Sequence, residues 1–365
     1  MKIDLKIITI LGTRPEIIKL SPLLPLLDQE FEHILIHTGQ HYDHNMDTVF
    51  FEELKLKGPD YSLNIGSHSH GKQTGLMLEK IEEILIKKKP DVVIVLGDTN
   101  TTLAGALAAS KLHVPLLHIE AGCRSFNRQM PEEINRVVAD RISNYLIAPD
   151  KESFGNLLNE GISPEKISLF GSTVFEAVLR NKEFAKNKLV LDAHSLEKDN
   201  FVLVTLHRAE NTDHLERFKG LVEVLNKIST QIKVVFPIHP RTKKLVEEQE
   251  ITFHPNVAVL EPQPYLNFLA LLSHCKLCLS DSGGIQEEAL VFNVPCLIPR
   301  EETEWMRLVK AGKNILVGTN PKKIVETVHD LLMDSKKLSE IKNKVYPFET
   351  GVSLKIVELI RGMRK

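Results

Sequence analysis

The side chains best suited to proton transfer in this sequence stand just behind short apolar runs. Asp98, Glu120 and His207 each come within two residues of the end of such a run. Carboxylates and imidazoles are the groups that most often move protons in catalysis. Because the strands of a parallel sheet end at one edge, where ligands bind, we expect these groups to line a ligand site. Taken singly, Asp98 also fits a helix cap, and His207 also fits a buried core histidine.

A second chemical signal is the stretch 281–288, which contains acids and two glycines and follows the apolar run 275–280. The pattern predicts a strand that turns into a helix. At that turn, the backbone N–H groups of residues 282–284 would be free to hold a phosphate. Glu288, about one and a half helical turns further on, is placed to accept hydrogen bonds from a sugar hydroxyl. A tight turn without a ligand is the alternative interpretation.

Glu132 stands behind Pro131 at the start of a predicted helix. It is either an acid/base candidate or a charge that complements the helix dipole. The chain contains neither a GxGxxG sequence nor a Walker A sequence. Nicotinamide chemistry and P-loop chemistry are therefore not indicated.

The histidines and cysteines do not predict a metal site. The histidine-rich stretch 37–44 and the pair His68 and His70 lack the ligand arrangement of a zinc site, and we interpret them as loop residues near the ligand site. Cys275 and Cys278 have the spacing of half a zinc site, but the sequence offers no second half. Buried free thiols are therefore favoured.

These candidate residues must be positioned by a repeated strand–helix pattern. Near-continuous runs of valine, isoleucine and leucine, separated by helix-length amphipathic stretches, are typical of parallel strands that are covered on both faces. The pattern predicts an α/β protein with two Rossmann-like, doubly wound domains. The predicted strands are 7–11, 34–37, 92–96, 116–119, 145–148, 167–170, 201–206, 234–238, 257–260, 277–280, 295–298 and 315–317.

The length of 365 residues suits two domains. The strand rhythm pauses near 171–195, which predicts an N-terminal domain over 1–172 and a C-terminal domain over 173–351, facing each other across a cleft. The amphipathic helix at 352–365 fits either domain, and one option is that it packs back on the first. A net charge of −2 gives no indication of a nucleic-acid partner. Without a signal pattern or a long apolar run, we expect a cytoplasmic protein that does not insert into a membrane.

Six motifs extend the chemical signals along nearly the whole chain. They are GTRPE at 12–16, GDTNT at 97–101, HIEAG at 118–122, PEEINR at 131–136, HRAEN at 207–211 and DSGGIQEE at 281–288. Together and in this order they resemble the non-hydrolysing UDP-N-acetylglucosamine 2-epimerases. Hydrolysing relatives typically carry an Ala-Asp type sequence where this chain has Pro15-Glu16.

The resemblance implies a GT-B-like pair of Rossmann domains, an active site in the cleft, a homodimer, and no metal or nicotinamide cofactor. It also implies a reaction in which UDP is eliminated across C1–C2 of UDP-GlcNAc. The resulting 2-acetamidoglucal is protonated on the other face while UDP adds back, which yields UDP-ManNAc. This route is needed because the C2 proton is not beside a carbonyl and is very hard to remove directly.

The resemblance also implies roles for individual residues. Several carboxylates in one cleft are expected to raise the pKa of at least one of them. The acid/base candidates are Asp98, Glu120 and Glu132, with His207 assisting at the diphosphate or as an acid; Arg14, Ser282, Gly283 and Gly284 would hold the phosphates, Gln263 and Phe268 the uracil, and Glu288 the ribose, and Lys19 completes the binding set. Which carboxylate is the base stays open.

One departure from the family pattern concerns the substrate. Trp305 and Arg307 stand in Thr-Glu-Trp-Met-Arg, where the family usually reads Thr-Glu-Arg-Pro-Glu. Trp305 is expected to stack on a ring, and Arg307 to supply the lost charge. A tryptophan here also occurs in relatives that epimerise modified UDP-sugars such as diacetamido-uronic acids. The loop 41–45 lacks the residues through which bacterial members bind a second UDP-GlcNAc, so we expect weak or absent activation of that kind.

Three alternatives to a UDP-GlcNAc 2-epimerase follow from the same residues. The first is a 2-epimerase of a modified UDP-sugar. The second is a GT-B glycosyltransferase, which would require an acceptor and show no solvent exchange at C2. The third is a non-catalytic UDP-sugar sensor, which would have no use for the intact set of acids.

Overall fold

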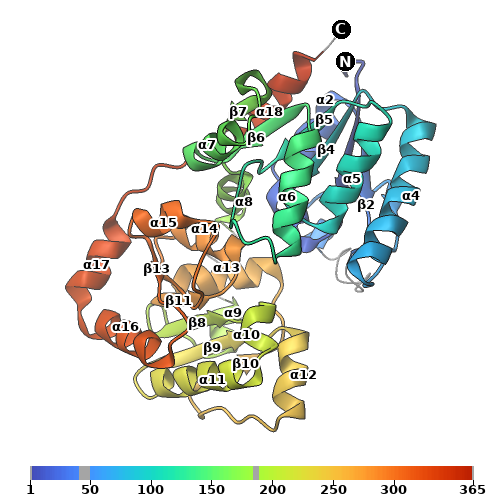
Figure 1. The fold of residues 1–365 in the computed structure, drawn as a ribbon. Helices are drawn as coiled ribbons and strands as arrows, with labels where there is room; N and C mark the ends of the chain where they lie inside the picture. Colours follow the sequence, from blue (N-terminus) through green and yellow to red (C-terminus); the bar gives the residue numbers. More distant parts are fainter. Residues whose placement is uncertain (1, 41–49, 184–188, 364–365) are drawn as a thin grey trace. The chain divides into compact units, whose positions relative to one another are not determined.

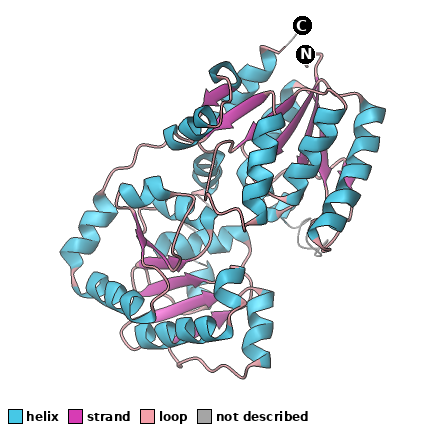
Figure 2. Cartoon of the chain, in the orientation of Figure 1, coloured by secondary structure: helices cyan, strands magenta, loops and turns pink. Residues whose placement is uncertain are grey.

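The computed structural model describes residues 2–40, 50–183 and 189–363. The chain divides into two compact units, each built around its own parallel sheet (Figure 1). Unit 1 comprises Met1–Ala177 and Phe348–Lys365, and unit 2 comprises Val178–Pro347. Strands alternate with helices along both units (Figure 2), as parallel neighbours require.

The sheet of unit 1 has seven strands in the order β3-β2-β1-β4-β5-β6-β7. Successive strands are added toward one edge from β1 to β3 and toward the other edge from β4 to β7, so the switch point at which doubly wound sheets place their ligands lies between β1 and β4. The strands are β1 Lys6–Leu11, β2 Glu32–His37, β3 Tyr61–Ser62, β4 Val92–Leu96, β5 Leu116–Ile119, β6 Tyr145–Ala148 and β7 Ile167–Leu169.

Helices cover both faces of this sheet. α4, α5 and α6 lie side by side over one face, and α18 packs on α2 (Figure 1). The helices are α1 Arg14–Leu20, α2 Leu24–Glu30, α4 His70–Lys88, α5 Asn100–Lys111, α6 Pro131–Ile142, α7 Lys151–Asn159, the 3₁₀ turn η1 Pro164–Lys166, α8 Thr173–Asn181, and α18 Val352–Arg361 at the end of the chain.

The C-terminal helix α18 belongs to unit 1. Its first turn is held by Glu176, whose carboxylate accepts hydrogen bonds from both the backbone N–H and the hydroxyl of Ser353. At the other end of the helix, Arg361 forms an ion pair with Glu30 at the end of α2. The buried face of α18 includes Ile356 and Ile360, so apolar packing complements these polar contacts.

The sheet of unit 2 has six strands in the order β10-β9-β8-β11-β12-β13, again with a switch point, between β8 and β11. The strands are β8 Phe201–Thr205, β9 Lys233–Pro237, β10 Val257–Leu260, β11 Leu277–Ser280, β12 Cys296–Ile298 and β13 Asn314–Leu316. The helices are α9 Leu189–Ala193, α10 Ala209–Thr212, α11 Leu215–Ser229, α12 Pro240–Glu248, α13 Tyr265–His274, α14 Gly283–Val291, α15 Met306–Lys310, α16 Pro321–Met333 and α17 Ser335–Asn343.

All twelve apolar runs are strands, which confirms the α/β class with two doubly wound parallel sheets. The strand missed by the sequence pattern is β3, which has only two residues and a half-polar sequence. Its place at the edge of the sheet needs no apolar run, because one side has no neighbouring strand. Cys275 and Cys278 are buried free thiols, as predicted, and so are Cys123 and Cys296. Within the part of the chain that the structure describes, no helix is long and apolar enough to cross a membrane.

Candidate active site

Unit 1 contains a cavity of about 280 Å³ at the carboxyl ends of β1 and β4, beside its switch point. Of the predicted site residues, Lys19, Asp98 and Glu132 line it. Glu120 lies directly behind the lining, because Lys19 reaches its carboxylate. The other lining residues are Thr13, Pro15, Glu16, Gln40, His70, Leu96, Gly97, Thr99, Asn100, Pro131 and Asn135.

The turn after β1 approaches its neighbours so closely that only glycine fits. A Cβ on Gly12 would lie 2.1 Å from Oγ1 of Thr38 and 2.3 Å from Oγ1 of Thr101. Both distances are far below van der Waals contact. The turn therefore packs tightly against the end of β2 and the start of α5, and α1 begins beside the cavity.

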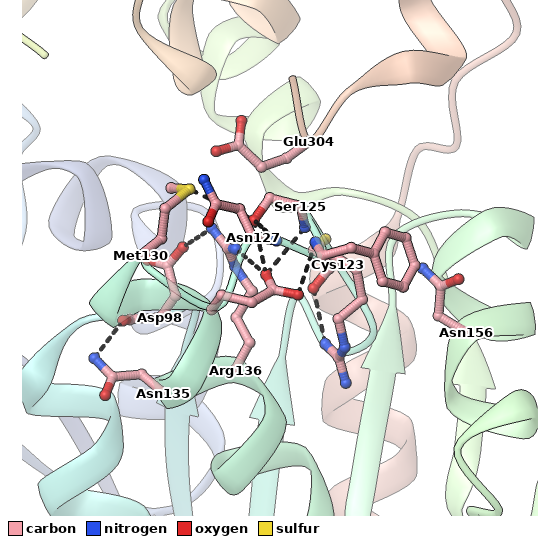
Figure 3. Close-up of polar contacts among 12 residues, drawn as sticks. Asp98, Cys123, Ser125, Asn127, Met130, Asn135, Arg136, Asn156 and Glu304 are labelled. Carbon is pink, nitrogen blue, oxygen red and sulfur yellow. Dashed lines mark hydrogen bonds and ion pairs between the residues drawn. The ribbon is translucent and has the colours of Figure 1, made fainter. Parts of the chain in front are cut away.

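Asp98, in the turn between β4 and α5, is held by residues of the first turns of α6 (Figure 3). Arg136 donates from Nη2 to its carboxylate at 2.5 Å, and Asn135 donates from Nδ2 to its backbone carbonyl at 2.9 Å. The interpretation of Asp98 as a helix cap is wrong, because Thr99 is the N-cap of α5. Asp98 thus keeps a partly exposed carboxylate, paired with a cation, in the cavity wall.

Glu120 has a strained backbone and a buried side chain. Its φ of 66° lies in the left-handed region, which costs a residue other than glycine of order 1–3 kcal/mol. Nζ of Lys19 donates to Oε2 of Glu120 at 2.7 Å. Oε1 is buried and has no hydrogen-bond partner among the described residues. A carboxylate held in this way fixes the position of the Lys19 ammonium group in the cavity wall.

The carboxylate with a raised pKa is Glu16, which was not among the predicted site residues. Burial raises its pKa from 4.5 to about 7, although several hydrogen bonds oppose the rise. The carboxylate accepts from the N–H of Gly12 at 2.9 Å, the hydroxyl of Thr13 at 2.8 Å and the hydroxyl of Thr99 at 3.0 Å. Glu16 therefore joins the turn after β1 to the turn after β4.

A buried polar network supports the loop that carries Glu120. Asp140 on α6 accepts from His118, from the N–H of Gly122 and from Arg124, and both ring nitrogens of His118 are engaged. Burial alone would raise the pKa of Asp140, but the charges and hydrogen bonds of His118 and Arg124 hold it below its ordinary value. Arg124 also pairs with Glu160 at 2.7 Å. The network ties β5 to α6 and α7.

In unit 2, His207 follows β8 and Asp281 follows the neighbouring strand β11. Nδ1 of His207 lies 3.0 Å from Oδ1 of Asp281, which is fully buried, whereas the side chain of His207 is 41% exposed. The interpretation of His207 as a core histidine is therefore wrong. Burial would raise the pKa of Asp281, but hydrogen bonds from His207 and Asn211 hold it below its ordinary value.

The predicted strand–helix turn at 281–288 is present, with Ser282 as the N-cap of α14. One expectation about it is wrong: the N–H of Ser282 is not free, because it donates to Oγ of Ser280 at 3.1 Å. Gly283 and Gly284 are the first helical residues, and their N–H groups have no acceptor four residues back in the helix. The Cβ position of Gly283 lies 3.8 Å from Nη2 of Arg208, which places a guanidinium beside this turn.

Trp305 packs against the same turn. Its Nε1 lies 3.4 Å from the Cβ position of Gly283, and the side chain is buried. The guanidinium of Arg307 stacks on the indole at 4.7 Å and pairs with the fully buried Glu287 at 2.8 Å. The group that stacks on Trp305 is thus the guanidinium of Arg307 in the same unit, and the charge of that guanidinium is paired with Glu287.

The remaining predicted binding residues are spread over both units. In unit 1, the guanidinium of Arg14 lies over the ring of Phe50. In unit 2, Gln263 donates to the carbonyl of Glu261, and Phe268 packs against the apolar core. Glu288 is buried on α14.

The histidine cluster is dispersed. His37 ends β2, as the predicted strand 34–37 requires, and His70 begins α4 and lines the cavity, so the assignment of these two histidines to loops is wrong. The stretch 41–45, where the activator prediction falls, lies outside the described residues. Across residues 2–40, 50–183 and 189–363, no group of three histidine, cysteine or acidic side chains is arranged to hold a metal ion.

Known proteins that are similar to this chain over most of its length are UDP-sugar 2-epimerases. A family model described as UDP-N-acetylglucosamine 2-epimerase matches residues 26–361. A protein of Methanococcus maripaludis named UDP-N-acetylglucosamine 2-epimerase is 48% identical over 370 residues, covering 99% of each chain. A protein of Pseudomonas aeruginosa named UDP-2,3-diacetamido-2,3-dideoxy-D-glucuronate 2-epimerase is 45% identical over 333 residues, covering 90% of this chain and 92% of the other.

A solved structure shows the same fold. The UDP-GlcNAc 2-epimerase of Methanocaldococcus jannaschii, crystallised with UDP-GlcNAc and UDP, matches with a TM-score of 0.90 at 47% identity, covering 98% of this chain and 99% of that one. The six motifs, the two parallel sheets and these full-length matches lead to one conclusion. The chain belongs to the UDP-N-acetylglucosamine 2-epimerase family and is an epimerase.

Proposed function

We propose that this protein interconverts UDP-GlcNAc and UDP-ManNAc without hydrolysis. The observation that carries the proposal is the cavity of unit 1, where two carboxylates, Asp98 and Glu132, share one wall with the ammonium group of Lys19. Inversion at C2 needs a group that removes a proton and a group that returns one. The relatives at 45–48% identity support the reaction class, since their names describe 2-epimerases of UDP-sugars.

The first step we propose is an elimination. A carboxylate takes the C2 proton, the C1–O bond breaks, and its electron pair leaves with the β-phosphate oxygen of UDP. The sugar becomes 2-acetamidoglucal, with a double bond between C1 and C2. In the second step a carboxylic acid protonates C2 from the opposite face while the UDP oxygen attacks C1, so that atoms and charge balance over the cycle.

We assign the proton transfers to Asp98 and Glu132, since both line the cavity. Glu120 is less accessible and is paired with Lys19. We therefore propose that Glu120 holds this cation toward the substrate, where the ammonium group and Arg14 stabilise negative charge as the C1–O bond breaks.

Unit 2 is proposed to bind the nucleotide. The N-terminus of α14, with Gly283, Gly284 and the hydroxyl of Ser282, is suited to hold the diphosphate, and Arg208 stands beside it. His207 faces the leaving oxygen in this arrangement. Glu288 would bind the ribose, while Gln263 and Phe268 would bind the uracil.

The decisive test is incubation with UDP-GlcNAc in D₂O, followed by proton NMR of C1 and C2. We expect deuterium at C2 together with a UDP-ManNAc anomeric signal. In substrate labelled with ¹⁸O at the oxygen that bridges C1 and the β-phosphorus, the label should also appear at the non-bridging positions of the β-phosphate, because C1–O cleavage leaves a terminal phosphate that can rotate. Free ManNAc and UDP as products would contradict the non-hydrolysing assignment. Deuterium exchange without ¹⁸O scrambling would contradict the elimination.

A modified UDP-sugar is the second candidate substrate. It is favoured by the buried Trp305 beside Gly283 and by the diacetamido-glucuronate 2-epimerase relative. The two substrates are distinguished by comparing kcat/KM for UDP-GlcNAc and UDP-2,3-diacetamido-2,3-dideoxy-glucuronate. Deuterium exchange with the second alone would contradict the UDP-GlcNAc proposal and keep the reaction type.

We further expect a cytoplasmic homodimer that needs no metal or nicotinamide. Light scattering of the purified protein tests the dimer, and activity after dialysis against EDTA tests the metal. Weak or absent activation by UDP-GlcNAc is expected in the reverse direction. A lag in UDP-ManNAc turnover that trace UDP-GlcNAc abolishes would contradict this last prediction.

A further inference from the structure

The turn that carries His207 is built around one buried carboxylate. Asp281 accepts hydrogen bonds from the backbone N–H of His207 at 3.1 Å, from the N–H of Arg208 at 3.1 Å and from Nδ2 of Asn211 at 2.9 Å. It also contacts the His207 ring at 3.0 Å. Four donors therefore converge on a side chain that solvent does not reach.

The contact with the ring fixes where hydrogen sits on the imidazole. The other three groups around Asp281 are N–H donors, so the carboxylate is an acceptor throughout. The lowered pKa of Asp281 agrees with an ionised group, although burial alone would raise that pKa. An ionised carboxylate beside Nδ1 requires a hydrogen on Nδ1. Nε2 is left as the nitrogen that meets a ligand.

The same turn stands beside the N-terminus of α14. Strands β8 and β11 are neighbours, and the hydroxyls of Thr205 and Ser280 at their ends lie 2.6 Å apart. The guanidinium of Arg208, the next residue after His207, reaches the Cβ position of Gly283. A diphosphate at α14 would therefore lie beside the exposed side of His207.

We propose that Asp281 is a positioning residue that holds the His207 ring in the Nδ1–H form and turns Nε2 toward the β-phosphate oxygen of the leaving UDP. The proposal rests on the proposed function, since it assigns that oxygen as the partner of Nε2. With hydrogen on both nitrogens, the ring donates from Nε2 to the oxygen that receives the electron pair of the C1–O bond. Asp281 itself does not touch the substrate.

Other titratable side chains lie near the same ring. The ring of His239, after β9, lies 6.2 Å away between centroids. Arg208 is adjacent in sequence and is paired with Glu304. A change at Asp281 must therefore be separated from a general change in the local charge, which requires a readout specific to the ring.

That readout is the tautomer of His207, measured by long-range ¹H–¹⁵N NMR at alkaline pH with ¹⁵N-labelled histidine. The His207 signals are identified by their loss in His207→Gln. We expect the Nδ1–H form in the unaltered protein. In Asp281→Asn, the amide N–H₂ can face Nδ1, and the ring should change to Nε2–H. An Nε2–H ring in the unaltered protein would overturn the proposal, even if Asp281→Asn does not fold.

The kinetic arm uses UDP-GlcNAc turnover and UDP binding. We expect Asp281→Asn to lower kcat by about 10²-fold while the Kd of UDP changes less than threefold. In the double variant with His207→Gln, the loss should be no larger than in His207→Gln alone, because Asp281 acts through the ring. Additive losses would overturn the proposal.

Asn211→Ala is the matched control, because it removes a donor from the same carboxylate without touching the ring. It should retain the Nδ1–H form and most of the turnover. A loss equal to that of Asp281→Asn would mean a purely structural carboxylate. If no UDP-sugar is epimerised, the proposed function fails, while the tautomer measurement still decides the pairing of Asp281 with His207.

Discussion

The ion pair of Asp98 in unit 1 and those of His207 and Arg208 in unit 2 differ in which partner is buried. In the cavity wall of unit 1, a buried base, Arg136, holds a more exposed acid, Asp98. In unit 2 the order is reversed: the buried acids Asp281 and Glu304 hold the more exposed His207 and Arg208. In these three pairs the buried partner presents a more exposed charge of the opposite sign, whereas the buried Glu120 of unit 1 presents Lys19 in the manner of unit 2. Under the proposed function, Asp98 in unit 1 exchanges a proton, and His207 and Arg208 in unit 2 bind an anion.

The largest effect is expected on kcat when Asp98, the more exposed acid of unit 1, is replaced. Asp98→Asn keeps the shape of the side chain but cannot take up a proton at pH 7. We expect kcat for UDP-GlcNAc to fall by about 10²–10⁴-fold. UDP affinity, which we assign to unit 2, should remain within threefold by calorimetry.

The matched control for this variant is Glu79→Gln, which alters an exposed carboxylate on α4 of the same unit. It should leave kcat unchanged. If Asp98→Asn lowered UDP affinity as much as it lowered turnover, the assignment of proton transfer to unit 1 and of UDP binding to unit 2 would be wrong.

The next effect concerns the buried network behind Glu120. In Asp140→Asn, Arg124 and His118 lose their shared anion inside unit 1. Removing one partner of a buried ion pair costs about 3–5 kcal/mol, and we expect a decrease of that size in the free energy of unfolding of unit 1, measured with urea.

Glu160→Gln serves as the comparison, because it alters the half-exposed second partner of the same guanidinium. It should cost less than about 1 kcal/mol. Equal costs for the two variants would show that burial of the partner does not decide the energy.

A pH-dependent effect follows from Glu16. Its pKa is about 7 in the folded chain against 4.5 as the ordinary value, so the folded chain holds a proton that the unfolded chain releases. The associated stability is full below pH 4.5 and is lost as the pH rises to 7. The loss amounts to about 3 kcal/mol, since one pKa unit corresponds to about 1.4 kcal/mol.

Glu16→Gln removes this titration. The free energy of unfolding is measured with urea at pH 4.5 and at pH 7.5 for both proteins. The value for the variant minus the value for the unaltered protein should be larger at pH 7.5 than at pH 4.5, because only the unaltered protein loses the stability associated with Glu16. A stability difference between the two proteins that is independent of pH would contradict the assignment.

The smallest effect is expected at an exposed pair. Asp213 and Arg241 in unit 2 lie 2.6 Å apart, but both are well exposed to water. Asp213→Asn should change the free energy of unfolding by less than about 0.5 kcal/mol. A larger effect would show that position in the unit, and not burial, sets the strength of its ion pairs.

The fold and the site differ in how far the sequence predicts them. Buried parallel strands are continuous apolar runs, so local composition identifies them, and the short edge strand β3 escapes because it needs no such run. Asp98 lies at the cavity because it follows a strand that ends there, whereas Glu132 and Lys19 reach it from helices α6 and α1. The position of Asp98 follows from the strand pattern, whereas Lys19 is predicted from the family resemblance.

Other features depend on which partner a side chain finds in three dimensions. Glu16 stands in a recognisable motif, yet its raised pKa depends on burial, which the motif does not express. The N–H of Ser282 donates to the hydroxyl of Ser280, two residues earlier, and is therefore not free to hold a phosphate. Arg307 is two residues from Trp305, but the buried Glu287 that neutralises it comes from another helix. Sequence spacing does not determine these competing partners.

The return of α18 to unit 1 has a consequence for biosynthesis. All of unit 2 leaves the ribosome before residues 348–363 do, so unit 2 has its complete sequence while unit 1 still lacks a helix. Until then α2 has no α18 to cover it, and Glu176 lacks the two donors of Ser353. The first unit to be translated is therefore the last to be completed, and a ribosome stalled before residue 348 would hold it with an exposed apolar surface.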